Sequence, residues 1–510
     1  MERVALVAST QLSLAWGGLA ISRLRLLQRA QCSSLVAVPS TASVAVILPC
    51  CGAYNFPYIC ERWNSQLNTA HAGPISFIFV VDSAKDPAFQ SICKYLERVH
   101  QIEEAREALQ TGTIGPLTKP LQLPASLVFK RISNHTVRVV EAGDALLCSQ
   151  KIHNVLEALN SCTEEFVIVF DDDIRVHRST IPSLVGALQT SPQALISTGY
   201  SVEVPVKDHG QRPPLSNAII MVYRSINLLS FFFRRVPACW GGCFCIRRQS
   251  LLQPIGKESH PIVDLWKKGG YSEDTILSTV AQKARMQIIA PQECIFVNEL
   301  PVTNTFRRSC FEYLRRQFFV LRTWQDTYGF LLNSCAAAVL LIGFPCLTLL
   351  VIIGLLTTLS AAFCCILKLL GMKTLVDRSL LLLQSLHLIP ITDSPQLAYN
   401  RLVTSTGTYA FALILLAVSH NVCFKTFVSL SNSCSRDKLR TRSHVSLLGT
   451  ALAFICYIFT VPVAAAAAIG VNSVDWGRLR YKVQKGSVVA VTPRRYRKEP
   501  STVVKQRAAV

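Results

Sequence analysis

Residues 166–177 read "FVIVFDDDIRVH", and this stretch decides the fold class. An apolar run of strand length leads directly into three consecutive carboxylates, those of Asp171, Asp172 and Asp173. Like charges this close repel one another and cost stability unless positive charge lies among them. A divalent cation that carries a phosphorylated ligand would supply that charge, whereas the alternative is an acidic turn on the surface. The stretch alone is compatible with both interpretations.

The same design recurs upstream, where "FIFVVDSAKDP" (77–87) ends an apolar run at Asp82, with Asp86 four residues later. From residue 43 to 305, short apolar runs alternate with mixed polar segments long enough for helices. This alternation predicts an α/β domain with a mostly parallel sheet and crossover helices. Ligands of such sheets bind beyond the carboxyl ends of the strands. Two strands therefore deliver carboxylates to one edge of one sheet.

The composition indicates a membrane protein. Half of the 510 residues are hydrophobic, only 16% are charged, and the mean hydropathy is +0.34. The net charge of +21 fits either a nucleic acid partner or the anionic face of a membrane. Long apolar segments favour the membrane and argue against a soluble nucleic-acid binder. The 19 cysteines, many within apolar runs, are expected to be reduced and mostly buried thiols.

The expected organisation has five parts, and the membrane region is multi-pass. Apolar stretches at 329–371, 402–424 and 446–470 are long enough to cross a bilayer, the first of them twice with a break at Gly343-Phe344-Pro345. The helix before them has apolar residues at helical spacing and several arginines, as in helices that lie in the headgroup region. The predicted parts are 1–26, a transmembrane signal-anchor or a cleaved targeting segment; 43–305, the α/β domain; 306–326, an interfacial amphipathic helix; 327–471, the transmembrane region; and 472–510, a basic tail.

A third acidic position, Glu273-Asp274, lies in "KKGGYSEDTILSTVAQK" (267–283). Apolar residues follow it at helical spacing, and Ser272 is suited to cap the helix. Acids at a helix start are favoured by its dipole, so capping alone is a sufficient explanation for this pair.

Taken together, the three acidic positions predict sugar transfer from a nucleotide diphosphate. The first acid can hold the nucleoside, and the second group can ligate Mg²⁺ or Mn²⁺, which bind diphosphates through oxygen and neutralise the departing charge. The third can take the proton from an acceptor hydroxyl as its oxygen attacks. Direct displacement of this kind inverts the anomeric centre.

Six motifs occur in an order that resembles plant-type ceramide glucosyltransferases. They are "CSQKIHN" (148–154), "DDDIRVH" (171–177), "WGGC" (240–243), "GGYSEDTIL" (269–277), "YLRRQFFVL" (313–321) and "WGRLRYKVQKG" (476–486). The resemblance covers residues 43–490. It implies a GT-A (Rossmann-like) catalytic domain and an integral-membrane inverting enzyme. Such an enzyme would transfer glucose from UDP-glucose to ceramide or a similar lipid on the cytosolic side of the Golgi or ER membrane, with the plastid envelope as a further possibility.

The resemblance assigns roles residue by residue. Asp274 matches the catalytic base and Glu273 its neighbour, while Asp171 and Asp173 match the metal site. The residues expected to bind the nucleotide sugar are Asp82 or Asp86, Lys151, Asp171, Trp240, Gly241 and Gly242. Independently of the resemblance, Lys151 would follow a helix start suited to phosphate. Likewise, Trp240-Gly241-Gly242 offers an aromatic wall beside backbone that a ligand can approach closely.

The chain departs from the family at the motif on the interfacial helix, an Arg/Gln-x-x-Arg-Trp pattern whose tryptophan lines the acceptor opening in that family. Here Arg315, Arg316 and Gln317 precede Phe318 instead of tryptophan. Alternatively, Arg322 and Trp324 take the role with shifted spacing. Acceptor specificity is what this departure affects. Two other functions fit the same pattern, namely a processive membrane polysaccharide synthase and a non-catalytic membrane scaffold that retains the domain.

Overall fold

The structure is a computed structural model. It describes residues 40–111, 128–132, 135–205, 214–228, 231, 234–256, 258–300, 310–386, 394–404 and 447–493, with isolated positions between 406 and 425. The predicted N-terminal anchor at 1–26, most of the apolar stretch at 402–424 and the end of the basic tail lie outside the described residues.

A nine-stranded sheet forms the centre of the domain, in the order β3-β4-β2-β1-β5-β9-β6-β10-β8. Six strands run in one direction: β1 (Val44–Cys50), β2 (Ile75–Val81), β4 (His135–Glu141), β5 (Phe166–Phe170), β6 (Ala194–Thr198) and β10 (Gln287–Ile289). Three run in the opposite direction: β3 (Val128–Ile132), β8 (Arg235–Val236) and β9 (Cys243–Arg247). The predicted α/β class with a mostly parallel sheet is therefore confirmed.

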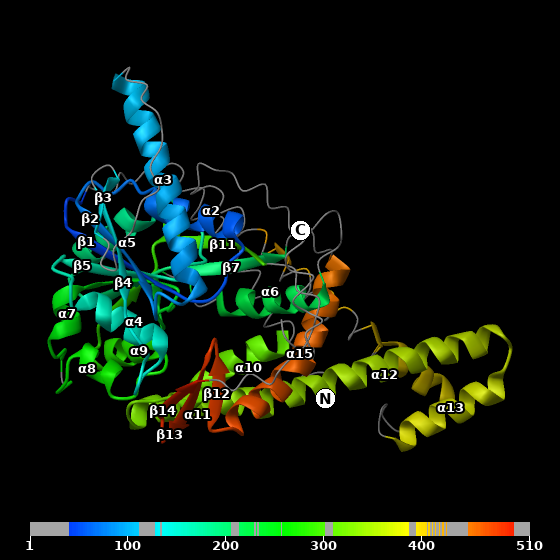
Figure 1. The fold of residues 1–510 in the computed structure, drawn as a ribbon. Helices are drawn as coiled ribbons and strands as arrows, with labels where there is room; N and C mark the ends of the chain where they lie inside the picture. Colours follow the sequence, from blue (N-terminus) through cyan, green and yellow to red (C-terminus); the bar gives the residue numbers. More distant parts are fainter. Residues whose placement is uncertain are drawn as a thin grey trace.

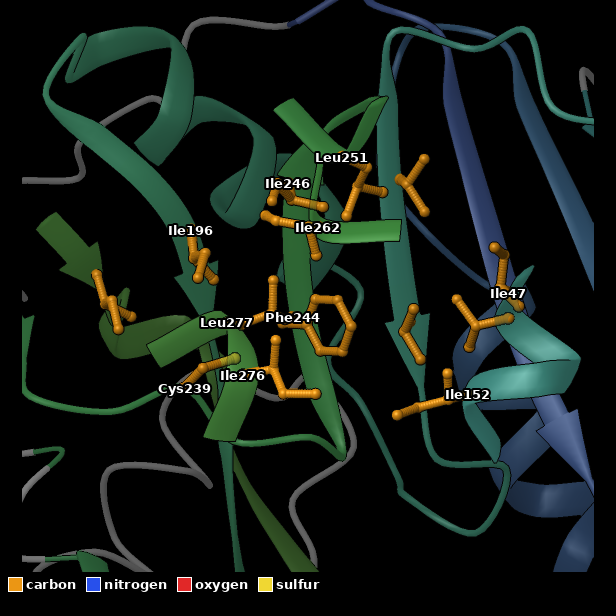
Figure 2. Close-up of a cluster of buried hydrophobic side chains, with 14 of the residues drawn as sticks. Ile47, Ile152, Ile196, Cys239, Phe244, Ile246, Leu251, Ile262, Ile276 and Leu277 are labelled. Atoms are coloured by element: carbon orange, nitrogen blue, oxygen red, sulfur yellow. The ribbon is translucent and has the colours of Figure 1, made fainter. Parts of the chain in front are cut away.

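Helices cover both faces of this sheet. Ala45 and Ile47 of β1 point into one hydrophobic cluster, and Val44, Val46 and Leu48 point into the other. Burial on both faces explains why the strands read as continuous apolar runs instead of alternating. Figure 2 shows the first cluster, to which Phe244 of β9 contributes. The covering helices are α2 (Phe56–Leu67), α3 (Pro87–Thr111), α4 (Gln150–Leu159), α5 (Thr180–Thr190), α7 (Arg248–Leu252), α8 (Ile262–Lys267) and α9 (Glu273–Lys283).

A second, two-stranded sheet pairs β7 (Tyr200–Pro205) with β11 (Ile295–Leu300) in parallel. β7 leads into the apolar helix α6 (Leu215–Leu228), which packs against α15 (Leu447–Ile469). The predicted interfacial helix appears as α10 (Glu312–Phe319), followed by a 3-10 turn at Val320–Arg322. Its apolar residues are buried in the cluster that contains α6 and α15 residues. α10 therefore buries its apolar face against protein.

The apolar region after residue 326 departs from the expected pair of spans. The chain stays helical through α11 (Thr327–Ala338), a π-helical segment (Val339–Gly343) and α12 (Phe344–Leu369). The ring of Pro345 conflicts with the carbonyl four residues earlier, at Leu341, and the π-helical segment absorbs this conflict without breaking the helix. Figure 1 shows α12 extending away from the sheet, with α13 (Lys373–Ser385) folded back beside it.

Within the part of the chain that the structure describes, two helical segments are long and apolar enough to cross a membrane. They are Thr327–Cys346, with a mean hydropathy of 1.8, and Leu448–Ile469, with 2.3. Length and composition alone define them, so a multi-pass arrangement stays a prediction.

The segment predicted as a basic tail begins with a folded element, here called the C-terminal meander (473–493). It consists of the antiparallel strands β12 (Ser473–Trp476), β13 (Leu479–Gln484) and β14 (Ser487–Pro493). In β13, buried and exposed residues alternate strictly, with Leu479, Tyr481 and Val483 buried. Alternation of this kind is the signal of a half-buried strand. The high positive charge of this segment led to its prediction as a basic tail instead of as a set of strands.

The turn between β13 and β14 packs tightly on the segment before α11. Gly486 has a φ of +83°, and a Cβ added there would lie 2.4 Å from the carbonyl oxygen of Trp324. Gly477, in the other turn of the meander, has a φ of +60° with nothing within 4 Å of an added Cβ. Gly486 is thus required by both its backbone conformation and its close contact, and Gly477 by its conformation alone.

Gly486→Ala should therefore destabilise the protein more than Gly477→Ala. The left-handed backbone costs either alanine about 1 kcal/mol. Overpacking against Trp324 adds about 1–3 kcal/mol at position 486 only. Thermal unfolding of the purified variants in detergent measures the difference. Equal midpoints for the two variants would contradict the packing of the C-terminal meander on Trp324.

Candidate active site

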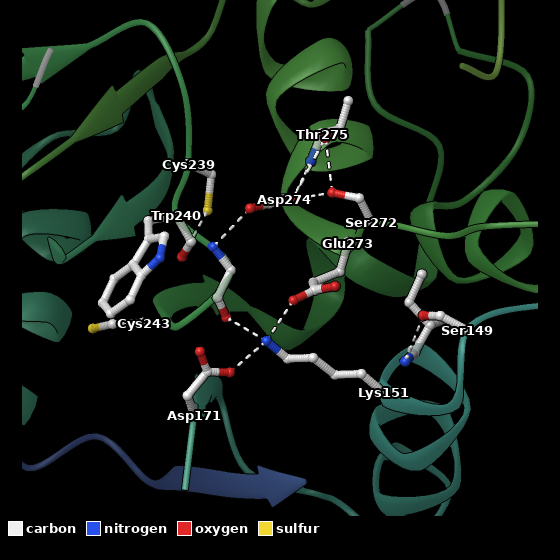
Figure 3. A network of polar contacts seen from close by, with 12 residues as sticks. Ser149, Lys151, Asp171, Cys239, Trp240, Cys243, Ser272, Glu273, Asp274 and Thr275 are labelled. Carbon is white, nitrogen blue, oxygen red and sulfur yellow. Dashed lines mark hydrogen bonds and ion pairs between the residues drawn. The ribbon is translucent and has the colours of Figure 1, made fainter. Parts of the chain in front are cut away.

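The predicted acidic positions meet at the carboxyl edge of the central sheet. Asp171 follows β5 directly, and Gly242 precedes β9 directly. These two strands pair at Phe170 and Cys243, so the loop before β9 lies against the end of β5. The amide of Asp171 accordingly donates to the carbonyl of Gly242 at 2.9 Å. Figure 3 shows α9 bringing Glu273 and Asp274 to the other side of the same loop.

Lys151 lies at the centre of this arrangement. Its Nζ is 2.6 Å from Asp171 Oδ1 and 2.6 Å from Glu273 Oε1, and it donates to the carbonyl of Gly241 at 3.0 Å. Ser149 positions it by capping α4, because its hydroxyl accepts from the amide of Ile152. The helix start predicted at Ser149 is confirmed.

Electrostatics explain why Lys151 is needed there. Burial raises the pKa of Glu273 to about 7, and the charge of Lys151 opposes that rise. Burial likewise disfavours the charge of Lys151, but Asp171 and Glu273 outweigh it and raise the pKa of the ammonium. Lys151 is therefore a fixed cation shared by two carboxylates. A contact between Lys151 and a phosphate stays a prediction.

The two glycines of the loop make room for the carboxylates. A Cβ on Gly241 would lie 2.5 Å from Glu273 Oε1 and 3.1 Å from Asp274 Oδ2. A Cβ on Gly242 would lie 2.3 Å from the ring of Trp240 and 2.7 Å from Asp171 Oδ2. A side chain at Gly241 would displace the Glu273 carboxylate, and one at Gly242 would displace the Trp240 ring or Asp171. The glycines therefore let the protein's own acids approach this loop closely.

Asp274 is held in one orientation by hydrogen bonds to both oxygens. Its Oδ2 accepts from the amide of Gly241 at 3.0 Å. Its Oδ1 accepts from the amide of Thr275 at 2.8 Å and from the hydroxyl of Ser272. Ser272 occupies the cap position of α9 but gives its hydroxyl to Asp274 instead of accepting from a backbone amide. The sequence thus supplies a carboxylate fixed at a helix start.

The three consecutive aspartates are in three different situations. Asp171 pairs with Lys151, and Asp172 accepts from the phenolic hydroxyl of Tyr54. Burial and the neighbouring charge of Asp173 raise the pKa of Asp172 to about 8. Asp173 is exposed, and it forms no ion pair with another residue in the described ranges. The run is therefore neither a uniform acidic turn nor a fully compensated cluster.

This arrangement fits a divalent cation that is shared with a phosphorylated ligand. In the described residues, no group of three or more His, Cys, Asp or Glu side chains is arranged to hold a metal alone. Mg²⁺ in phosphate complexes uses one or two carboxylates and takes its remaining ligands from phosphate and water. The exposed Asp173, next to Asp171, offers that number of carboxylates.

Asp82 and Asp86 differ in their surroundings. Asp86 Oδ1 accepts from the amides of Gly52 at 2.7 Å and Ala88 at 2.8 Å, which makes it the cap of α3. Asp82 is 3% exposed and accepts from Asn154 Nδ2 at 3.1 Å. It also pairs with Arg478 of the C-terminal meander at 3.1 Å. Burial raises the pKa of Asp82, and Asn154 and Arg478 oppose the rise.

Of the residues predicted for the acceptor side, Trp324 comes close to the predicted base. It borders a recess that also contains Ser272, whose hydroxyl binds Asp274. The lining residues are Tyr271, Ser272, Thr275, Ile276, Thr279, Thr323, Trp324, Gln325 and Gly329. The lining of the recess is therefore uncharged, with hydroxyl groups and two aromatic rings, those of Tyr271 and Trp324.

The other predicted acceptor-side residues have structural partners. Arg315 pairs with Glu312 at 2.8 Å, and Arg316 lies over the ring of Trp476. Gln317 is half-buried on the same helix. Phe318 is buried against Tyr223, and Arg322 donates to the carbonyl of Ile469 at the end of α15. The structure does not bring these five residues to the recess.

Sequence reasoning did not single out Arg224 of α6. Its guanidinium carbon is 5.6 Å from the ring centre of Tyr313 and 6.0 Å from that of Trp240, and its Nη2 is 3.8 Å from Glu203 Oε1. Burial raises the pKa of Glu203 to about 7, opposed by Arg224. A lone arginine within the apolar run "AIIMVYRSI" (218–226) was the available signal, because charged residues are rarely buried without a partner.

Comparison with known proteins gives similarity to solved structures only. No model of a known protein family matches the sequence, and no curated protein matches it. One similar structure is a mannosyltransferase from Pyrobaculum calidifontis in complex with GDP-Man and Mn²⁺, with a TM-score of 0.35 and 12% identity, covering 92% of this chain and 97% of that chain. Another is glucosyl-3-phosphoglycerate synthase from Mycobacterium tuberculosis, with a TM-score of 0.28 and 14% identity, covering 54% of this chain and 80% of that chain. At such scores the similarity carries no argument about activity, which must come from the site itself.

Replacing Lys151, the central cation of the site, should lower the free energy of unfolding. Lys151→Met leaves Asp171 and Glu273 without their shared partner, and breaking a buried ion pair in this way costs about 3–5 kcal/mol. Because Glu273 can take up a proton, the loss should be smaller at about pH 5 than at about pH 8. Unfolding of the purified protein at both pH values measures it.

Lys283→Met is the matched control. Lys283 also pairs with two acids, Glu258 and Asp326, the latter at 2.8 Å, but it is 35% exposed, so its loss should cost about 0–1 kcal/mol. Equal destabilisation by the two substitutions would contradict the central role of Lys151.

Proposed function

We propose that this chain is a membrane-bound, metal-dependent, inverting glycosyltransferase of the GT-A type that transfers glucose from UDP-glucose to ceramide or a similar lipid. The observation that carries the proposal is the position of Asp274. Its carboxylate accepts from the amide of Gly241, whose carbonyl binds Lys151, and from Ser272 and Thr275, which both line the uncharged recess beside Trp324. Under the proposal, a base held in this way would serve a donor at the Asp171 edge of the sheet and an acceptor in the recess.

The donor side is the carboxyl edge of the sheet. Asp171 and Asp173 would hold Mg²⁺ or Mn²⁺ together with the diphosphate, and the bound metal would neutralise charge on the departing diphosphate. Lys151 keeps Asp171 and Glu273 in place, and Trp240 with Gly241 and Gly242 forms the wall beside them. The exposure of Asp173, together with its lack of an ion-pair partner among the described residues, supports this assignment.

The acceptor side is the recess. An acceptor hydroxyl that enters beside Trp324 and Thr275 meets Asp274, which accepts its proton as the oxygen attacks the anomeric carbon. The bond from that carbon to the diphosphate breaks as the new bond forms on the opposite face, so the configuration inverts. Fixing the base before the reaction lowers the cost of reaching this geometry.

The proposal of a lipid acceptor is supported by what adjoins the recess. Gly329 is a lining residue and belongs to α11, one of the two segments apolar enough to cross a membrane. The next side chains of α11, Phe330, Leu331 and Leu332, are exposed. A lipid held in the bilayer would therefore present its head group at the recess. The choice of ceramide, and of the Golgi or ER membrane, comes from the motif resemblance.

The test is glucose transfer by membranes that contain the full chain, supplied with ceramide and labelled UDP-glucose. Wild-type protein should place label in the lipid fraction. Asp274→Asn should lower kcat by about 10²–10⁴, because the acceptor loses its base. Asp264→Asn, an acid in the first turn of α8, is the control and should retain activity.

The other outcomes are equally specific. Label in a polymer instead of a lipid would favour the polysaccharide synthase. Release of free glucose without a lipid product would indicate a working donor site and a different acceptor. No product in any fraction would leave the scaffold as the remaining function.

Metal dependence has its own prediction. Chelation should abolish transfer, and added Mn²⁺ should restore it. Asp173→Asn should raise the Mn²⁺ concentration needed for half-maximal activity by about tenfold or more, because one of few carboxylate ligands is lost. A titration of activity against Mn²⁺ measures this, with Asp264→Asn as the reference. An unchanged titration would remove Asp173 from the metal site.

A further inference from the structure

Arg478 comes from the C-terminal meander to the acid that was expected to hold the nucleoside. It lies in the turn between β12 and β13, directly after Gly477. Its Nε is 3.2 Å and its Nη2 3.1 Å from Asp82 Oδ2, and Nη2 is 2.7 Å from Asp144 Oδ1. Two carboxylates thus hold one guanidinium from two sides.

The meander is anchored at three places around the candidate site. The phenolic oxygen of Tyr481 accepts from the amide of Gln150, at the start of the helix that carries Lys151. The amide of Val488 donates to the carbonyl of Gly269, in the loop before α9. The amide of Trp324 donates to the carbonyl of Gly486. Its position is therefore fixed by the same segments that carry the base and the recess.

Exposure decides which of the two charges a ligand would meet. Asp82 is 3% exposed, whereas the side chain of Arg478 is 38% exposed. Asp82 already accepts from Asn154 through Oδ1 and from Arg478 through Oδ2. The guanidinium therefore covers the carboxylate. Of the five donors of Arg478, those on Nη1 make no hydrogen bond to the residues that the structure describes.

We propose that Arg478, and not Asp82, contacts the nucleotide of the donor, and that Asp82 and Asp144 hold its guanidinium for that purpose. Nη1 donates to oxygen acceptors of the nucleotide, which are carbonyl oxygens of the base, hydroxyls of the ribose or a phosphate oxygen. This inference rests on the proposed function and adds the C-terminal meander to its donor site.

The chemistry favours arginine for this task. A guanidinium fixed by two carboxylates keeps its planar geometry, so it loses little conformational freedom when it binds. Its charge-assisted hydrogen bonds are stronger than those of a neutral donor. Because Arg478 does not contact Asp274, it can change the affinity for the donor without changing the proposed base.

The experiment measures binding of UDP in the presence of Mn²⁺, and then kcat and KM for UDP-glucose, with the full chain in detergent. Arg478→Gln should weaken UDP binding and raise the donor KM by about ten- to a hundredfold, with kcat within about twofold. Arg478→Lys should show an intermediate effect, because it keeps the charge and loses the planar fork.

Arg480→Gln is the matched control on the same meander. Among the described residues, Arg480 pairs only with Asp475 of the neighbouring strand, at 2.6 Å. The substitution Arg480→Gln should therefore leave the affinity for UDP unchanged. Asp144→Asn releases one side of the guanidinium from an exposed position. It should weaken UDP binding by about two- to fivefold. If Arg478→Gln lowers the unfolding midpoint, Asp144→Asn tests the role of Arg478 in its place.

The outcomes separate this inference from the proposed function. Wild-type protein that binds no UDP would contradict the proposed function. Wild-type binding with equal affinity in Arg478→Gln and Arg480→Gln would overturn only the role of Arg478. A fall in kcat with an unchanged donor KM would also overturn it, because that pattern belongs to a residue that acts on the reaction step.

Discussion

The candidate site depends on one buried cation. Asp171 arrives from β5 and Glu273 from α9, and Lys151 lies within 2.6 Å of both. Holding the buried carboxylate of Glu273 close to that of Asp171 would cost several kcal/mol without that charge. The capped start of α4 delivers it, and the two glycines of the loop before β9 leave the space that it needs. Sheet, helix and loop are thereby fixed relative to one another, and Asp274 is held beside them.

The acids of the site differ in how their negative charge is balanced. Lys151 pairs with both Asp171 and Glu273, Tyr54 binds Asp172, and Asp173 alone is left exposed without an ion-pair partner in the described ranges. A run of three acids is therefore tolerated because each member has a different environment. The repulsion that remains is concentrated at the edge of the sheet, where a cation and a phosphate would relieve it.

Local pattern predicted the parts that depend on neighbours in sequence. The apolar runs gave the strands, and Asp82 and Asp171 lie at one edge because parallel strands end together. The cap at Ser149 was equally local. The contact of Arg478 with Asp82 could not be predicted from the sequence, because the two residues are 396 positions apart and no local pattern encodes such a contact. The expected break at Pro345 also failed, because a π-helical segment absorbs the conflict at a cost that local propensity does not reveal.

The two sides of Asp274 differ in a way that suits two substrates of opposite solubility. The carboxyl edge of the sheet combines charged side chains from the sheet, α4 and the C-terminal meander. The recess on the other side is uncharged and continues into α11, whose apolar side chains are exposed. Under the proposed function, a water-soluble nucleotide sugar would approach along the charged edge and a lipid along the apolar helix. The backbone amide of Gly241 donates to Asp274 and the carbonyl of Gly241 accepts from Lys151, so a single residue connects the proposed base to the central cation.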